Sequence, residues 1–181
     1  MLTLDQFLMS VEGKAYGMAM LAVKNEADAL DIVQDSMIKL ATGYGQLADT
    51  GEQDQWRPLF YKILQNCIMD FHRKERRIKR WFVRPKATPD AEEDADTDLD
   101  NLSLQVEHSP EQYLQQTQMG EQALQAVEAL PVKQQQCFLL RCWEGFSVQE
   151  TAKMMNIGEG SVKTHYHRAL QKIQQVLNEN A

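Results

Sequence analysis

The stretch from Leu59 to Arg80, LFYKILQNCIMDFHRKERRIKR, sets the plan of the chain. Its first half repeats apolar residues every three to four positions, which predicts a helix with one buried face. The apolar positions are Leu59, Phe60, Ile63, Leu64, Cys67, Ile68 and Phe71. We expect the other face to expose Tyr61, Gln65, Asn66, Asp70 and Arg73. The helix should begin at Asp54 or Gln55 and end near Phe82.

The second half of the stretch replaces apolar periodicity with positive charge. Between Arg73 and Lys86 lie eight bases and one acid, together with the aromatic residues Trp81 and Phe82. A few bases at a helix end would need no explanation beyond the helix dipole. Eight bases in fourteen residues beside two aromatic side chains favour a nucleic-acid partner, with Arg76 and Arg77 among the candidate contacts.

The overall acidity of the chain does not contradict a nucleic-acid partner. The net charge is −7, but residues 90–111 alone hold nine acids and no Lys or Arg. Residues 1–89 carry a charge of +2, and residues 112–181 carry none. The excess acid therefore belongs to one short segment, and the rest of the chain is free to bind a polyanion.

Length and composition indicate a globular protein of one or two small domains, since the chain has 181 residues, 43% of them hydrophobic and 25% charged. No apolar run reaches the roughly 18 residues that cross a bilayer, and the N-terminus lacks a signal-peptide pattern. We therefore expect a cytoplasmic protein without membrane insertion. Cys67, Cys137 and Cys142 form no CxxC pair and are interpreted as reduced core thiols, with redox sensing by the last two as the alternative.

Two more helices are predicted before the opening stretch. Thr3 can cap a helix that runs to about Lys24, and Asn25 can cap the next one. At helical spacing the second helix should bury one stripe, made of Ala29, Val33, Met37, Leu40, Ala41 and Tyr44.

The outer face of this second helix is predicted to dock another protein. Asp28, Asp31 and Asp35 share that face, and Ile32 and Ile38 flank them. Isoleucines outside the buried stripe are typical of an interaction surface. A cation site formed by the three aspartates is the alternative interpretation.

The acidic segment divides the chain. It has no helical period and contains two prolines within residues 83–108, which predicts a flexible linker. The fold class is therefore expected to be all-α, with two small helical domains at residues 1–84 and 109–181 joined by the acidic linker 85–108. Ser109 to Gln112 forms a capping box that should open the second domain, and Leu130-Pro131 should separate its first helix from one at about 132–143.

The end of the chain carries a helix-turn-helix pattern. Ser147 and Glu150 form a capping box, Asn156-Ile157-Gly158 supplies the turn, and a last helix begins near Glu159. The outer face of the last helix offers side chains that suit base edges and phosphates, namely Ser161, Lys163, Thr164, His165, His167 and Arg168. The alternative is a helical corner with a polar outer face.

Three blocks of the chain resemble the extracytoplasmic-function (ECF) group of bacterial sigma-70 factors. Asp28 to Asp35 is similar to region 2.2, which docks on the β′ clamp helices of RNA polymerase. Phe60 to Arg73 is similar to regions 2.3 and 2.4, which open and read the −10 promoter element. Leu130 to Leu170 resembles region 4, which reads the −35 element. The resemblance covers nearly all of the chain except the linker.

The resemblance implies a role for each matched residue. Contacts with core polymerase are implied for Asp28, Asp31, Ile32, Gln34 and Asp35. Contacts near the −10 strand are implied for Tyr61, Asn66, Asp70 and Arg73, with the loop before Trp56. Contacts with the −35 duplex are implied for Lys163, Thr164, His165, His167 and Arg168. Two departures concern the −35 interface, because His165 and the run Gln134 to Gln136 stand where arginine is common in the family.

The implied function is transcription initiation. The partners would be core RNA polymerase, through its β′ clamp helices and β flap, promoter DNA and an anti-sigma factor. We expect no catalysis and no cofactor, because the sequence has no nucleophile–base pair, phosphate-binding glycine loop or metal-ligand spacing.

Two alternatives remain open. The first is an ordinary helix-turn-helix regulator, because Val162 to His165 also resembles the LuxR-type DNA-binding domain. The second is an all-α metal hydrolase that uses Asp28, Asp31, Asp35 and Asp70.

Overall fold

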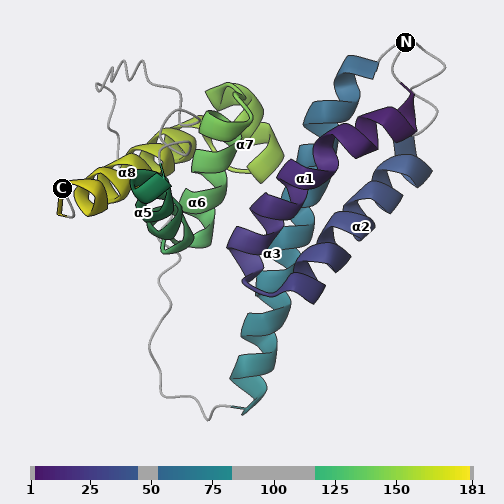
Figure 1. Cartoon of the computed structure of the whole chain (residues 1–181). Coiled ribbons are helices and arrows are strands. Elements are labelled where there is room, and N and C mark those ends of the chain that lie inside the picture. The colour runs from purple at the N-terminus through teal and green to yellow at the C-terminus, as the bar shows by residue number, and fades with distance from the viewer. Residues whose placement is uncertain (1–2, 45–52, 83–116, 180–181) are drawn as a thin grey trace. The chain divides into compact units, whose positions relative to one another are not determined.

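The computed structural model describes residues 3–44, 53–82 and 117–179, and every regular element within these ranges is helical (Figure 1). The chain divides into two compact units, Met1–Asp94 and Ala95–Ala181. The all-α prediction is therefore confirmed. The predicted linker and the capping box at Ser109 lie outside the described residues. Among those residues, no helix is both long and apolar enough to cross a membrane.

Within its described residues, the first unit has three long helices, α1 (Leu4–Val23), α2 (Glu26–Tyr44) and α3 (Trp56–Phe82), and a short 3₁₀ turn, η2 (Gln53–Gln55), precedes α3. Both predicted caps are present. The Thr3 hydroxyl accepts a hydrogen bond from the Gln6 amide at 3.2 Å, and the Asn25 side chain accepts one from the Asp28 amide at 3.0 Å. Each cap satisfies an amide that the first turn of its helix leaves without a partner.

Aromatic packing holds the start of α3 against α1. The Phe7 ring lies 5.7 Å from the Trp56 ring and 6.1 Å from the Phe60 ring, centroid to centroid. Trp56 and Phe60 are fully buried, and the burial of each large side chain contributes roughly 1.5–3 kcal/mol. Alanines at positions 15, 19 and 22 of α1 are also buried, which lets the helices approach closely.

The buried stripe of α2 differs from the prediction. Ile32 and Ser36 are buried, whereas Ala41 and Tyr44 are exposed. The reason is that α2 packs on both α1 and α3, so its buried face is wider and centred differently from that of a helix with one neighbour. Ser36 fits this apolar setting because its hydroxyl donates a hydrogen bond to the Ile32 carbonyl at 2.7 Å.

The second unit contains α5 (Thr117–Glu128), α6 (Val132–Phe138), a π-helical turn η3 (Leu139–Trp143), α7 (Val148–Met155) and α8 (Glu159–Glu179). α8 packs against α5, α6 and α7. Gly145, with φ of +72°, follows the π turn, and the left-handed conformation there suits glycine. The break predicted at Leu130-Pro131 and the start of the last helix at Glu159 are confirmed.

Three consecutive glutamines, Gln134, Gln135 and Gln136, are buried in this unit. Gln135 donates to the Val127 carbonyl of α5 at 3.1 Å, and Gln136 donates to the Gln135 side chain at 3.0 Å. Lys172 of α8 donates to Gln134 at 3.2 Å. The glutamines therefore connect α5, α6 and α8 through hydrogen bonds. The resembled family commonly has an arginine in this stretch. Because the three glutamines are buried, none of them offers a surface side chain in place of that arginine.

Candidate nucleic-acid interface

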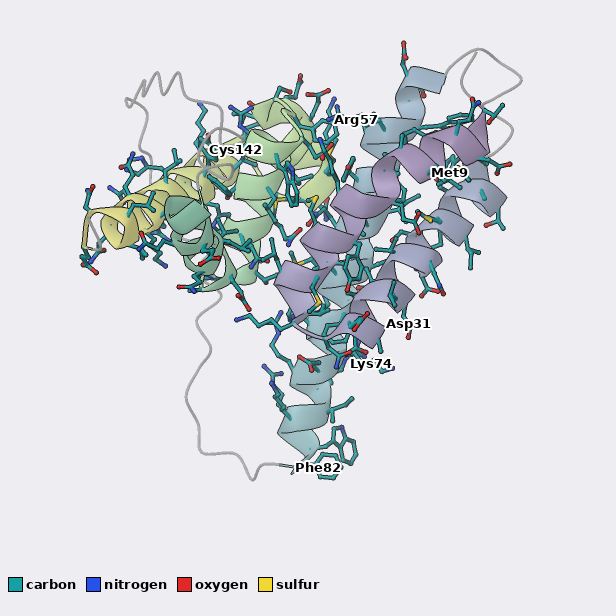
Figure 2. The ribbon with its side chains drawn as sticks, viewed as in Figure 1. Met9, Asp31, Arg57, Lys74, Phe82 and Cys142 are labelled. Carbon is teal, nitrogen blue, oxygen red and sulfur yellow. The ribbon has the colours of Figure 1, made fainter. Side chains whose placement is uncertain are left out.

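The outer face of α2 presents acidic and polar side chains at the surface. Asp31, Gln34 and Asp35 are exposed, and Asp28 is half-buried; Figure 2 labels Asp31 on this helix. Ile32, which was predicted to share this face, is only 6% exposed and belongs to the core. Exposed apolar neighbours on α2 are Leu30, at 44%, and Ile38, at 59%. The face therefore combines carboxylates with one isoleucine rather than two.

The aspartates of this face do not gather as ligands. Among residues 3–44, 53–82 and 117–179, no three His, Cys, Asp or Glu side chains lie close enough to hold a metal ion. The geometry thus gives no support to the cation site or to the metal hydrolase.

The middle of α3 exposes fewer of the predicted residues than expected. Asn66, Asp70 and Arg73 lie at the surface, but Tyr61 is 0% exposed and Gln65 is buried. The Tyr61 ring packs edge-on against Phe60 at 5.4 Å, and the Arg57 guanidinium lies 6.0 Å from its centroid. The prediction that Tyr61 is a surface aromatic is wrong, because α3 is covered by both α1 and α2 and its buried face includes that position. The loop before Trp56 lies largely outside the described residues.

Two polar contacts lie beside this surface, one within α3 and one between α2 and α3. Arg73 and Asp70 form an ion pair at 2.7 Å, and both side chains are well exposed, so the pair adds little stability. The Lys39 ammonium donates to the Cys67 sulfur at 3.3 Å, and this hydrogen bond raises the pKa of Lys39. Lys39 thus stays cationic beside Asp35 and Asp70, which are its further electrostatic partners.

The last turns of α3 form a cationic tip, which we define as residues 73–82. Every residue of the tip is exposed, and it carries six bases against one acid, a formal charge of +5. Arg76 and Arg77 lie within it, as predicted. Figure 2 labels Lys74 and Phe82 near its two ends. An exposed, strongly cationic helix end can bind phosphates without reading a sequence.

The helix-turn-helix of the second unit has the predicted local structure. The Ser147 hydroxyl accepts from the Glu150 amide at 3.2 Å, and the Glu150 carboxylate accepts from the Ser147 amide at 2.8 Å. The turn uses Asn156 in the left-handed conformation, with φ of 54°. Cys137, Ala152 and Val162 form the buried cluster behind the motif, and Ile157 packs against it.

Sulfur and phenol groups fix α8 to the preceding turn. The Cys137 thiol donates to the Val162 carbonyl at 3.3 Å, and burial raises the pKa of that thiol to about 12. The Cys142 sulfur lies 3.0 Å from the Tyr166 hydroxyl, and burial raises the pKa of both groups. Raised pKa values disfavour the thiolate, so these cysteines have the properties of core thiols rather than redox sensors.

The six predicted residues form two neighbouring rows along the outer face of α8. Ser161, Thr164, His165 and Arg168 follow helical spacing along one side, whereas Lys163 and His167 lie next to them. Lys163 is exposed and the other five are half-buried. The Thr164 hydroxyl donates to the Gly160 carbonyl at 3.0 Å. The face is thus a compact polar surface whose backbone is fixed by the buried Val162, Ala169 and Ile173.

Comparison with known proteins gives a consistent result. A family model described as sigma-70, region 4 matches residues 120–173. The RNA polymerase sigma factor SigV of Bacillus subtilis is 29% identical over 156 residues, which cover 86% of this chain and 79% of SigV. The ECF RNA polymerase sigma factor SigM of Mycobacterium tuberculosis is 25% identical over 173 residues, which cover 96% of this chain and 76% of SigM.

A solved structure shares the fold. The sigma factor RpoE of Bartonella quintana, crystallised in complex with the anti-sigma factor NepR, matches with a TM-score of 0.63 and 19% identity over 96% of each chain.

Proposed function

Because this chain belongs to the extracytoplasmic-function group of sigma factors, we propose that it binds core RNA polymerase, directs it to promoters through their −10 and −35 elements and supports transcription initiation. The observation that carries the proposal is the presence on one chain of an exposed cationic helix end and a helix-turn-helix. The first suits sequence-independent phosphate binding, and the second suits base readout in a major groove.

Each of the three exposed surfaces has its own binding partner in the proposed complex. Asp28, Asp31, Gln34 and Asp35 of α2 contact the β′ clamp helices, and Ile38 replaces Ile32 as the apolar contact. Asn66, Asp70, Arg73, Arg76 and Arg77 of α3 lie near the −10 element. The outer face of α8 meets the −35 duplex, and the β flap is the second polymerase contact. This role needs binding and not catalysis.

An anti-sigma factor is a proposed partner, by analogy with the Bartonella RpoE–NepR complex. Such a partner would compete with polymerase for the free chain. A cytoplasmic location follows from the proposed function, because the polymerase acts there.

Transcription in vitro tests the proposal. Core polymerase from a matched bacterium is supplied with genomic DNA, with and without this chain, and new transcripts are mapped. We expect initiation at specific sites that depends on the chain. Absence of a stable complex with core polymerase would refute the proposal.

A pair of variants tests the docking face. Asp31→Asn together with Asp35→Asn should weaken core binding by about tenfold, because it removes two exposed carboxylates from the proposed interface. Glu12→Gln is the matched control, since Glu12 is an exposed acid on α1 of the same unit. If Glu12→Gln weakens core binding as much as the double variant does, net charge and not the α2 face governs docking.

A further inference from the structure

Lys39 of α2 and Cys67 of α3 form an amine–thiol contact between the two helices. The Lys39 Nζ donates a hydrogen bond to the Cys67 Sγ at 3.3 Å. Cys67 is 8% exposed, whereas Lys39 lies at the surface, so the lysine side chain reaches the sulfur from the solvent side. A buried cysteine usually acts as a small apolar side chain. A cationic donor held against the sulfur is instead a feature of reactive thiols.

The other two cysteines have partners of a different kind. The Cys137 thiol donates to the Val162 carbonyl, and the Cys142 sulfur contacts the Tyr166 hydroxyl. Neither partner is an amine, and burial raises the pKa of both thiols. Within the part of the chain that the structure describes, Cys67 is therefore the cysteine that has a primary amine at hydrogen-bond distance.

A sulfur and an amine held in this way can be joined by an oxidant. Thiolates react with hydroperoxides to give a sulfenic acid, and sulfenic acids condense with a nearby nitrogen to give a sulfenamide. Hydrogen peroxide suits this site because it is small. It needs only a displacement of the flexible Lys39 side chain to reach a sulfur that is 8% exposed. The packing of α2 against α3 excludes bulkier oxidants.

We propose that Lys39 and Cys67 form a modification site at which hydrogen peroxide produces a sulfenamide cross-link between α2 and α3. In the first step the Cys67 Sγ attacks one peroxide oxygen. An S–O bond forms, the O–O bond breaks, the sulfur loses an electron pair to the peroxide, and the second oxygen leaves as water.

The second step forms the cross-link without further oxidation. The neutral Lys39 Nζ attacks the Sγ of the sulfenic acid, an S–N bond forms, and the S–O bond breaks. The departing oxygen takes a proton from the nitrogen and leaves as water. One thiol, one amine and one hydrogen peroxide thus give one sulfenamide and two waters.

The first step prepares the amine for the second. In the reduced protein, the hydrogen bond to Cys67 and the charge of that sulfur raise the pKa of Lys39 and keep the amine protonated. Oxidation to a sulfenic acid removes that anionic partner, so Lys39 releases its proton more readily. Asp35 and Asp70 still favour the ammonium form, and cross-linking should therefore accelerate as the pH rises. This chemistry belongs to the chain alone and does not depend on the proposed function.

The test uses the full chain, treated with hydrogen peroxide with and without dimedone, which traps sulfenic acids. Trypsin does not cut after a modified lysine, so cross-linked Lys39 stays within residues 25–62, while Cys67 falls in residues 63–73. Mass spectrometry should find these two peptides joined, with two hydrogen atoms fewer than the separate peptides. Dithiothreitol should release them, because a thiolate attacks the sulfur and frees the amine.

Lys39→Arg separates the two steps. A guanidinium keeps the charge and the hydrogen-bond donor but stays protonated. Dimedone should therefore still trap Cys67, whereas the cross-link should fall at least tenfold. Lys62→Arg is the matched control, since Lys62 is an exposed lysine of α3, and it should leave the cross-link unchanged. In the wild-type chain, the ratio of cross-link to dimedone adduct should rise up to about tenfold from pH 7 to pH 8, in step with the neutral amine.

Three results would overturn the proposal. The first is a wild-type chain in which dimedone traps Cys67 but no cross-link forms when dimedone is absent. The second is a cross-link that persists in Lys39→Arg, which would require another nitrogen. The third is a Cys67 thiol that stays reduced at peroxide concentrations that oxidise the half-buried Cys142. Lys39 is exposed, so circular dichroism of Lys39→Arg should match that of the wild-type chain.

Discussion

The cationic tip of α3 and the outer face of α8 are both proposed to meet DNA, yet they are built in opposite ways. The tip is a helix end whose residues 73–82 are all exposed, with its charge concentrated on six bases. The α8 face has few charges, and its side chains are mostly half-buried over a core that contains Val162, Ala169 and Ile173.

This difference separates affinity from selectivity. Charges on an exposed helix end attract phosphates wherever they lie, and salt weakens that attraction. A polar face held by a packed core can place each side chain against one base edge, which is the requirement for reading sequence. We therefore expect the tip to respond to charge removal, and the α8 face to respond to changes in its supporting core.

The largest effect is expected for Arg76→Ala combined with Arg77→Ala. Loss of two phosphate contacts should weaken promoter binding by the polymerase complex roughly a hundredfold at low salt and reduce the log–log salt slope by about 2. Core binding should be unchanged. Fluorescence anisotropy across a salt series measures both quantities, and Lys62→Ala on the same helix is the control. Equal loss of core and DNA binding would show that the tip is part of the polymerase interface.

The next largest effect, on the stability of the second unit and on −35 binding, is expected when a substitution creates a cavity behind α8. Val162→Ala removes two methyl groups from a fully buried site, at a cost of about 2 kcal/mol. Amide hydrogen exchange should accelerate in α7 and α8 and stay unchanged in α1 to α3. Binding to the −35 duplex should fall although no contact residue was altered. Unchanged −35 binding would mean that the α8 face does not depend on its core.

Alkaline pH should also distinguish the two surfaces. The folded-state pKa of Cys137, about 12, lies above its ordinary value of 9.0, so the stabilising contribution is complete below about pH 9 and is lost as pH rises toward 12. Between about pH 9 and 10 the second unit should lose up to about 1 kcal/mol, since the unfolded thiol ionises first.

Hydrogen exchange of α6 and α8 across that pH range measures the loss. Cys137→Ala should flatten the profile, whereas α3 amides serve as the internal control after correction for the intrinsic exchange rate. An identical pH response in wild type and variant would exclude the thiol as its source.

The smallest effect on stability is expected for Ile78→Ala, the aliphatic deletion at the tip. Ile78 is about half exposed, so its truncation should change the free energy of unfolding by less than about 0.5 kcal/mol, against about 2 kcal/mol for Val162→Ala. Urea denaturation followed by circular dichroism compares the two. Similar costs would mean that the tip packs against something that stabilises it.

Much of the fold could be predicted from the sequence because its signals are local. The caps at Thr3, Asn25 and Ser147 depend on residues three positions apart, and the break at Pro131 follows from one missing amide hydrogen. The helix-turn-helix was found for the same reason. The cationic tip needed no tertiary information either, because its charges follow one another in the chain.

The errors all concern tertiary contacts. Ile32 and Tyr61 were placed on surfaces because the period of one helix does not show how many neighbours that helix has. Gln134 to Gln136 look like surface residues until the carbonyl of Val127 and the amine of Lys172 are brought to them by the fold. Of the two isoleucines predicted to flank the aspartates of α2, only Ile38 is exposed, because two covering helices bury Ile32.

The buried glutamines have a consequence for how stability changes with temperature. Exposure of hydrocarbon on unfolding raises the heat capacity, whereas exposure of amides lowers it. A core that buries Gln134, Gln135 and Gln136 beside its apolar residues should therefore unfold with a smaller heat-capacity change than an all-hydrocarbon core of the same size. Its stability curve should therefore be slightly flatter, so the free energy of unfolding of this unit should fall more slowly on either side of its maximum.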